Sequence, residues 1–138
     1  MDILVYLLDS NVITDMVKHV HGVSDRVRAA TLRGDQVCLT TPVHYEIVRG
    51  LTKLDARRQL EDYYSYIVPA LRWKSLIRKD WDQAADLWAQ TQKRGRQLSD
   101  MDLLLAAMSN RLDAILVTAD EDFSILPIKR ENWRLSSE

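Results

Sequence analysis

Residues 3–8 form a continuous apolar run, Ile-Leu-Val-Tyr-Leu-Leu, that ends directly at Asp9. A strand covered by helices on both faces reads in this way, whereas a strand with one solvated face alternates between apolar and polar residues. A second run of this kind, residues 114–118, lies near the other end of the chain. The two runs predict buried parallel strands, and therefore an α/β sandwich with a central, mostly parallel sheet.

Helical segments separate the expected strands. Segments 11–19 and 24–33 follow the first strand, and Thr41-Pro42 starts a helix after a strand over residues 37–40, since Thr is a cap residue and Pro favours the first helical position. We expect the remaining elements in this order: a helix over 55–68 that ends at Pro69, a strand over 70–76, a helix over 81–95, a helix capped by Ser99, the strand over 114–118, a turn at 120–123 and an edge strand near Ile128.

We interpret the aromatic side chains as packing groups. Trp81 and Trp88 stand seven residues apart, with alanines at positions 84 and 85 completing the i, i+3, i+4, i+7 spacing of a buried helix face. Three tyrosines of the expected 55–68 helix are predicted to pack between helices: Tyr63, Tyr64 and Tyr66. Base stacking is the alternative for these rings.

Length and charge set further limits. A chain of 138 residues has the size of one domain, which we assign to residues 1–138. Lys and Arg number 19 against 20 Asp and Glu, a net charge of −1, so nucleic-acid binding requires a local arrangement of cations rather than a strong overall field. Cys38 has no second cysteine to pair with, and no apolar run approaches the roughly 18 residues of a membrane span. We therefore expect a cytoplasmic protein with no disulfide and no membrane association.

Four acidic side chains are predicted to lie near one edge of the sheet. Asp9 follows the first strand, and Asp120 comes two residues after the strand over 114–118. Ligand sites of parallel sheets lie beyond these carboxyl ends. Glu46 lies in the second turn of the third expected helix, at the border of its apolar stripe, and Asp102 lies in the first turn of the last one.

Carboxylates that converge in this way need a positive partner. Two unit charges about 4 Å apart repel by about 4 kcal/mol at an effective dielectric constant near 20, so a cluster of four must take up protons or a cation. Oxygen-only sites suit Mg²⁺ or Mn²⁺, which activate water for phosphodiester hydrolysis. The three histidines lack the spacing of a zinc site.

The four acids stand in short motifs: Leu8-Asp9-Ser10-Asn11, Glu46-Ile47-Val48-Arg49-Gly50, Asp102-Leu103-Leu104-Leu105-Ala106-Ala107 and Val117-Thr118-Ala119-Asp120. Together with Asn132-Trp133 near the end, they resemble the acidic motifs of PIN-domain ribonucleases, in the same order and over almost the whole chain. The small, single-domain form is most similar to the VapC toxins of bacterial and archaeal toxin–antitoxin pairs.

The resemblance implies a PIN-like α/β/α sandwich and an Mg²⁺- or Mn²⁺-dependent endoribonuclease. By motif position, Asp9, Glu46 and Asp102 match the core metal-binding acids and Asp120 matches a fourth, and we expect these four to be catalytic. Four further residues are expected to support the site: Ser10, Asn11, Asp100 and Thr118. Asp100 is a departure, because many relatives have a non-acidic residue there, and Asp122 is an alternative to Asp120.

The resemblance also implies partners. The RNA substrate would be cut to leave a 3′-hydroxyl and a 5′-phosphate, and a cognate antitoxin would block the active-site groove. Small relatives usually pair, so we expect a homodimer, with the 55–68 helix as its surface. Four cations near the acidic motifs are candidates for RNA phosphate contacts: Arg49, Lys93, Arg94 and Arg96.

Other interpretations remain open at this point. Each acid taken singly is explained as a helix or turn cap, although capping predicts no shared location. A non-catalytic module with the PIN scaffold, which binds a protein partner or RNA, would need no metal. A phosphoacceptor receiver domain would need a lysine after the last sheet strands, for which Lys129 is the only candidate. The number of metal ions, one or two, also stays open.

Overall fold

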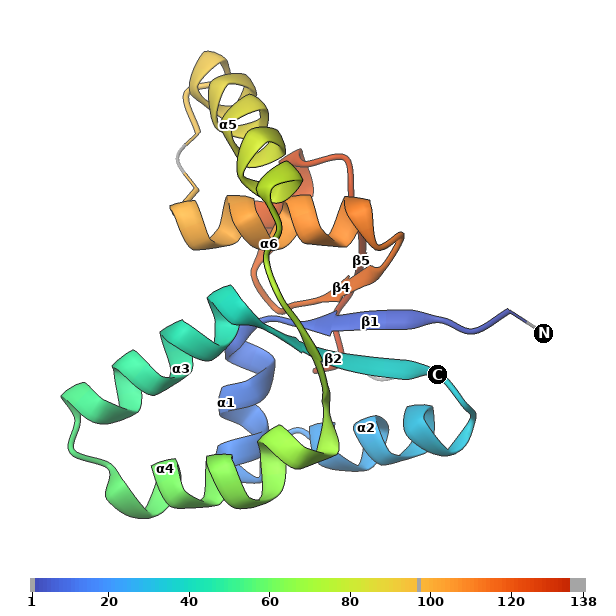
Figure 1. Ribbon diagram of the computed structural model, residues 1–138, viewed down its shortest axis with the longest axis vertical. Coiled ribbons are helices and arrows are strands. Elements are labelled where there is room, and N and C mark those ends of the chain that lie inside the picture. Colours follow the sequence, from blue (N-terminus) through green and yellow to red (C-terminus); the bar gives the residue numbers. More distant parts are fainter. Residues whose placement is uncertain (1, 97, 135–138) are drawn as a thin grey trace.

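The computed structural model describes residues 2–96 and 98–134 (Figure 1). The strands of its one parallel sheet are β1 (Val5–Leu8), β2 (Gln36–Thr40), β3 (Arg72–Lys74), β4 (Ile115–Val117) and β5 (Lys129–Glu131). They are ordered β3-β2-β1-β4-β5, and every neighbouring pair is parallel. The expected parallel sheet is confirmed, with β1 at its centre and β5 at its edge.

Helices cover both faces of the sheet. They are α1 (Ser10–Lys18), α2 (Val23–Leu32), α3 (Thr41–Lys53), α4 (Arg57–Asp62), α5 (Arg78–Lys93) and α6 (Asp100–Arg111). In Figure 1, α1 to α4 lie below the strands β1 and β2, and α5 and α6 lie above them. The expected α/β/α sandwich is therefore confirmed. Across residues 2–96 and 98–134, no helix combines the length and the apolar content of a membrane span.

The core explains the two sequence runs that are apolar without alternation. Leu7 and Leu8 of β1 are fully buried, because helices cover both faces of the central strand. The run Leu103–Met108 of α6 is buried on every side for the same reason, since this helix lies between the sheet and α5. Only its first turn, which carries Asp102, reaches the carboxyl edge of the strands.

The strand order brings the carboxyl ends of three elements together. The chain runs outward through β2 and β3 and then returns to the other side of β1 for β4. Leu8 pairs with Val117 in register, and the next residue, Asp9, donates its backbone N–H to the carbonyl oxygen of Val117 at 2.9 Å. Such a point of reversal in strand order is where open parallel sheets bind ligands.

The prediction that Trp81 and Trp88 belong to the core is wrong. Their exposed fractions are 56% and 50%, and the buried face of α5 instead contains Asp80, Ala84 and Leu87. Asp80 accepts two hydrogen bonds from the guanidinium of Arg111 on α6, at 2.8 and 3.0 Å. The buried face of α5 thus begins with a charged residue whose partner lies on another helix. The apolar spacing in the sequence takes no account of such a pair, and it therefore predicted burial of the neighbouring face.

The expected 55–68 helix is shorter and changes its winding. After α4, residues Tyr63–Ile67 form a π-helical turn, and Val68–Ala70 form a 3₁₀ turn that contains Pro69. Tyr63 is fully buried and Tyr64 is half exposed but still packs against other rings, whereas Tyr66 is exposed, so the packing prediction is wrong for Tyr66. The tight turns leave only three residues for β3 in place of the expected 70–76.

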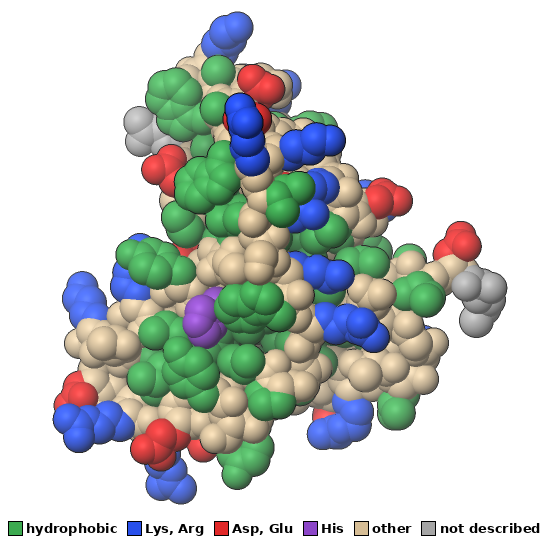
Figure 2. Space-filling view, in the orientation of Figure 1, with side chains coloured by type: hydrophobic (Ala, Val, Ile, Leu, Met, Phe, Trp, Pro, Cys, Tyr) green, Lys and Arg blue, Asp and Glu red, His purple; other side chains and the backbone are tan. Residues whose placement is uncertain are grey.

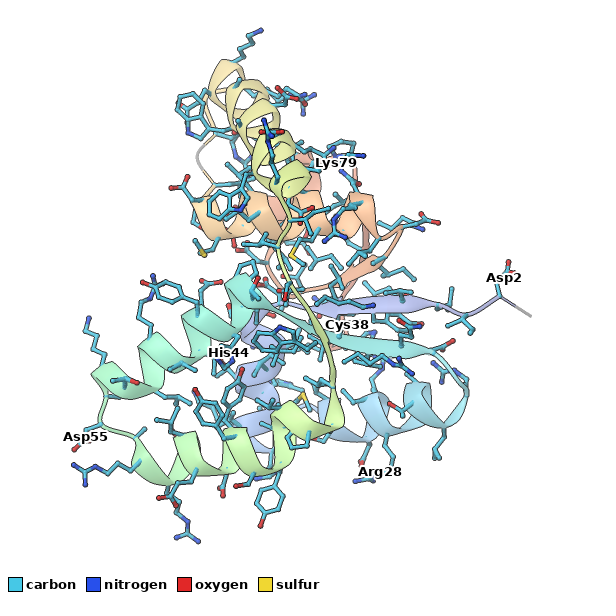
Figure 3. The ribbon with its side chains drawn as sticks, viewed as in Figure 1. Asp2, Arg28, Cys38, His44, Asp55 and Lys79 are labelled. Carbon is cyan, nitrogen blue, oxygen red and sulfur yellow. The ribbon has the colours of Figure 1, made fainter. Side chains whose placement is uncertain are left out.

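Tyr63 packs in an aromatic cluster with a histidine of α3. Its hydroxyl and Nδ1 of His44 share a hydrogen bond of 2.7 Å, and the two rings are stacked. Tyr64 and Trp73 contact the same imidazole edge-on. In Figure 2 a histidine, in purple, lies among hydrophobic side chains on this face, at the place where Figure 3 labels His44. The cluster fixes α3, and with it Glu46, against the π-helical turn and β3.

Candidate functional site

Asp9 lies at the carboxyl end of β1, where it is the N-cap of α1. Its side chain is buried, with an exposed fraction of 3%, and it accepts hydrogen bonds from three neutral donors. The backbone N–H of Ser10 donates to Oδ1 at 2.7 Å, and the hydroxyl of Thr118 and Nδ2 of Asn11 donate to Oδ2 at 2.7 and 3.2 Å. These bonds hold the carboxylate in one orientation.

Asn11 and Thr118 also hold the loop after β4. Oδ1 of Asn11 accepts the backbone N–H of Ala119 at 3.2 Å, and the hydroxyl oxygen of Thr118 accepts that of Asp120 at 3.0 Å. The residues that orient Asp9 are therefore the same ones that place Asp120 beside it. Ser10, Asn11 and Thr118 thus each donate a hydrogen bond to Asp9.

Asp9 differs from the two other buried aspartates. Asp15 is paired with Arg134 and Asp80 with Arg111, each through two hydrogen bonds to a guanidinium. Within the described part of the chain, Asp9 has no cationic partner, and the charged groups nearest to it are acids. A buried carboxylate in such surroundings is costly unless a proton or a cation compensates its charge. Burial accordingly raises the pKa of Asp9, and the charge of Asp120 adds to the effect.

Glu46 extends toward Asp9 from the second turn of α3. Burial, together with the charges of Asp9 and Asp102, raises the pKa of Glu46 from 4.5 to about 7. The guanidinium of Arg49, one turn later, lowers it. The buried face of α3 explains the position of Glu46. Val43 and Ile47 face the core, and Glu46 lies at the border of the stripe that they form.

Asp102 approaches from the N-terminal turn of α6. Ser99 caps the helix, and its hydroxyl oxygen accepts the backbone N–H of Asp102 at 3.1 Å, as the sequence predicts. Burial, together with the charges of Asp9 and Asp120, raises the pKa of Asp102 from 3.8 to about 6. Hydrogen bonds from Ser99 act in the opposite direction.

Asp9, Glu46 and Asp102 form the acidic centre. Each offers a carboxylate oxygen, and the three oxygens lie within 4.8 Å of one another. Oxygen ligands lie about 2.1 Å from Mg²⁺, so two ligands of one ion are at most about 4.2 Å apart. Three carboxylate oxygens this close could share one ion after side-chain adjustment, and hard oxygen donors are the ligands that Mg²⁺ and Mn²⁺ prefer. The residues present fit a divalent cation.

The other predicted acids lie around this centre rather than in it. Asp120 is close enough for its charge to raise the pKa of Asp9 and Asp102, but its Oδ1 accepts the backbone N–H of Asp122 at 2.9 Å. Asp122 is exposed and forms an ion pair of 3.3 Å with Arg96. Asp100 is exposed at the first position of α6. Among residues 2–96 and 98–134, the group of acids close enough to share an ion is Asp9, Glu46 and Asp102.

The predicted phosphate-binding cations fall into two sets. Arg49 borders a cavity of about 340 Å³ between α1 and α3, which Ser10 and Glu46 also line. Arg94 and Arg96 instead contact the 3₁₀ turn Glu121–Ile125, through the carbonyl oxygen of Ile125 at 3.1 Å and through Asp122. Lys93 ends α5 and is exposed. Arg49 is thus the cation of the four that lines the same cavity as an acid of the centre.

The position of Lys129 decides the receiver-domain interpretation. Lys129 contacts the carbonyl oxygen and the carboxylate of Asp113, and it begins β5 at the amino end of the sheet, opposite to the acids. The receiver-domain interpretation, which needs this lysine at the acidic edge, is therefore wrong.

A contact between Tyr45 and Arg49 was not predicted from the sequence. The guanidinium of Arg49 lies 5.0 Å from the centre of the Tyr45 ring, and the i, i+4 spacing of the two residues was a signal for such a contact. Figure 3 labels His44, the neighbour of Tyr45, on α3.

Comparison with protein families gives one match, to the PIN domain, over residues 6–129. Comparison with curated proteins gives no significant match.

Solved structures share the fold at low sequence identity. A crystal structure of VapBC2 from Rickettsia felis, bound to a DNA fragment from its promoter, aligns with a TM-score of 0.85 at 20% identity and covers 94% of this chain and 99% of that one. DNA-bound VapBC from Salmonella typhimurium gives 0.82 at 20%, covering 95% and 99%. VapC20 from Mycobacterium tuberculosis, described as a sarcin-ricin loop cleaving toxin, gives 0.68 at 15%, covering 89% and 95%.

Proposed function

Since the chain belongs to the PIN-domain family, as the match over residues 6–129 establishes, we propose that it is a metal-dependent endoribonuclease. The observation that carries this proposal is the acidic centre, in which carboxylates of three separate elements lie within 4.8 Å of one another. A fold gains no stability from such repulsion, so the arrangement is best explained by the cation that it binds.

In the proposed mechanism, Asp9, Glu46 and Asp102 would hold one or two Mg²⁺ or Mn²⁺ ions, and Asp120 would complete the site directly or through water. When bound, such an ion supplies a water nucleophile at neutral pH and stabilises negative charge on the phosphate. Thr118 and Asn11 keep Asp9 in the orientation for binding through the hydrogen bonds described above.

The cations of the site act on the RNA backbone. Arg49 lines the cavity beside Glu46 and is exposed, so it is placed to contact a phosphate next to the centre. Arg94 and Arg96 are committed to the 3₁₀ turn near Asp122, and we assign them, with Lys93, to more distant phosphates.

We further propose that the protein is the toxin of a type II toxin–antitoxin module, acts in the cytoplasm and is inhibited by a cognate antitoxin. The VapBC complexes that share the fold support this assignment. We retain the proposed homodimer but not its predicted surface, because Tyr63 and Ile67 of the 55–68 segment are buried. The exposed rings of Trp81 and Trp88 on α5 are a better surface for it.

The direct test of the activity is RNA cleavage with and without Mg²⁺, for the wild type and for Asp9→Asn. Asn also caps helices, so this substitution removes the charge and keeps the cap of α1. Asp25→Asn on α2 is the matched control, because Asp25 is exposed and its ion pair with Arg28 lies at the surface. We expect the wild type and the control to cleave RNA when Mg²⁺ is present and not when it is absent. Equal cleavage by Asp9→Asn, or cleavage that does not depend on the metal, would reject the mechanism.

A further inference from the structure

Tyr45 and Arg49 form an exposed pair on α3. They stand four residues apart, so their side chains lie on the same helix face, and the guanidinium carbon of Arg49 lies 5.0 Å from the centre of the Tyr45 ring. The exposed fraction of Tyr45 is 54%. The pair therefore presents a flat ring and a fixed positive charge to solvent.

The pair lies directly beside the acidic centre. Glu46 is the residue after Tyr45 and stands three residues before Arg49, so one stretch of helix surface carries all three side chains. Arg49 shares the lining of one cavity with Glu46 and Ser10. Arg49 thus lies next to an acid of the acidic centre.

The core has no need of the Tyr45 ring. The aromatic cluster of this region forms around the preceding residue, His44, which packs against Tyr63, Tyr64 and Trp73. Tyr45 is not a member of that cluster, and its ring instead contacts the guanidinium of Arg49. Packing explains His44 but leaves the aromatic character of Tyr45 unexplained.

A ring and a guanidinium in this arrangement match the two parts of a nucleotide. Unpaired RNA bases stack on tyrosine rings and on guanidinium planes, and phosphates accept charge-assisted hydrogen bonds from arginine. We propose that Tyr45 and Arg49 together bind one nucleotide of the substrate beside the cleaved bond, with Tyr45 stacking on an unpaired base and Arg49 contacting its phosphate. This inference rests on the proposed ribonuclease function.

The alternative is a pair that only stabilises the surface of α3, which an exposed cation–π contact also does. The two roles differ in what they predict for RNA without bases. If Tyr45 stacks, its loss weakens binding to RNA but not to an abasic oligomer of the same length. If Arg49 contacts a phosphate, its loss weakens binding to both. A purely structural role predicts no such difference.

The test measures the affinity of the full chain for a labelled single-stranded RNA 12-mer of mixed sequence and for an abasic 12-mer, in EDTA to suppress hydrolysis. The variants are Tyr45→Ala and Arg49→Gln. The matched controls are Tyr66→Ala and Arg28→Gln, two exposed residues that line a different cavity, between α1 and α2. Thermal unfolding of each variant reports the state of the fold, and Tyr45→Phe keeps the ring.

We expect Tyr45→Ala to weaken binding of the RNA about tenfold and of the abasic oligomer hardly at all, and Tyr45→Phe to bind like the wild type. Arg49→Gln should weaken both and reduce the slope of log affinity against log salt by about 0.7. Affinities for the RNA equal to wild type in both variants, or equal losses for RNA and abasic oligomer in Tyr45→Ala, would overturn the inference. A wild type that neither binds nor cleaves RNA would instead reject the proposed function itself.

Discussion

Thr118 donates its hydroxyl proton to Oδ2 of Asp9 across 2.7 Å, although 109 residues separate the two in the sequence. The bond joins the ends of β1 and β4, which are neighbours in the sheet. The hydroxyl is neutral, so it holds the buried carboxylate without neutralising its charge, as a cation would. The negative charge of Asp9 therefore stays available for a metal ion.

Substitution of Thr118 by Val should reduce RNA cleavage while the fold persists. Val keeps the shape of the side chain but removes the hydroxyl, so one of the three hydrogen bonds that orient Asp9 is lost. Loss of a hydrogen bond to a metal ligand lowers metal affinity or activity by about 10- to 100-fold. Initial cleavage rates across a Mg²⁺ titration measure the effect, and Thr118→Ser, which restores the donor, should recover most of it. A Val variant as active as wild type would show that the bond does not matter for the site.

Stability in the absence of metal should fall as the pH rises. Burial and the neighbouring acids raise the pKa of Glu46 from 4.5 to about 7 and of Asp102 from 3.8 to about 6. The folded chain therefore binds more protons than the unfolded chain between these values, and the free energy of unfolding decreases across the same range. Divalent cation should reduce the decrease, because it compensates the ionised carboxylates.

Thermal unfolding between about pH 4 and pH 8, in EDTA and in Mg²⁺, measures this effect. Glu46→Gln is the informative variant, since removal of the titrating group should flatten the upper part of the decrease in EDTA. Melting temperatures that rise through this range without metal would contradict the electrostatic account of the centre.

Arg111→Leu should destabilise the protein without acting on the acidic centre. Asp80 is buried, and its partner Arg111 gives it two hydrogen bonds, so the substitution leaves an uncompensated charge between α5 and α6. Breaking a buried ion pair in this way costs about 3–5 kcal/mol. Chemical denaturation measures the loss, and the double variant Asp80→Asn, Arg111→Leu should recover part of it. A loss for Arg111→Leu below about 1 kcal/mol would contradict this role of the pair.

Elements that are buried on all sides were predictable from sequence, because burial there depends on composition alone. The runs at residues 3–8 and 114–118 gave β1 and β4, and the Ser99 cap before an apolar run gave α6. The positions of Asp9 and Asp102 follow from these elements. Their approach to Glu46 follows from the strand order β3-β2-β1-β4-β5, which was not predicted from the sequence.

Features that depend on distant partners were not predictable. The buried face of α5 includes Asp80, which pairs with Arg111 of α6. No local sequence pattern predicts a buried acid within an apolar stripe. The π-helical turn after α4 shifts the helix faces, so that Tyr63 is buried while Tyr64 and Tyr66 are exposed. In both places tertiary packing decided which face is covered.

The exposed rings of α5 predict the behaviour of the proposed homodimer. Light scattering should give a dimeric mass for the wild type and a monomeric mass for the double variant Trp81→Gln, Trp88→Gln. Because both rings are half exposed, the double substitution should change the free energy of unfolding of the monomer by at most about 1 kcal/mol. A monomeric wild type would reject the dimer, and a dimeric double variant would reject this surface.

Titration calorimetry with Mn²⁺ tests most directly whether the acidic centre is a metal site. The wild type and the Asp25→Asn control should bind Mn²⁺ with the same affinity, whereas Asp9→Asn and Asp102→Asn, which each remove one of three carboxylates, should bind it far more weakly. A wild type that binds no Mn²⁺, or variants that bind it as tightly as the wild type, would contradict the proposed metal site. Either result would favour a non-catalytic module with the PIN scaffold.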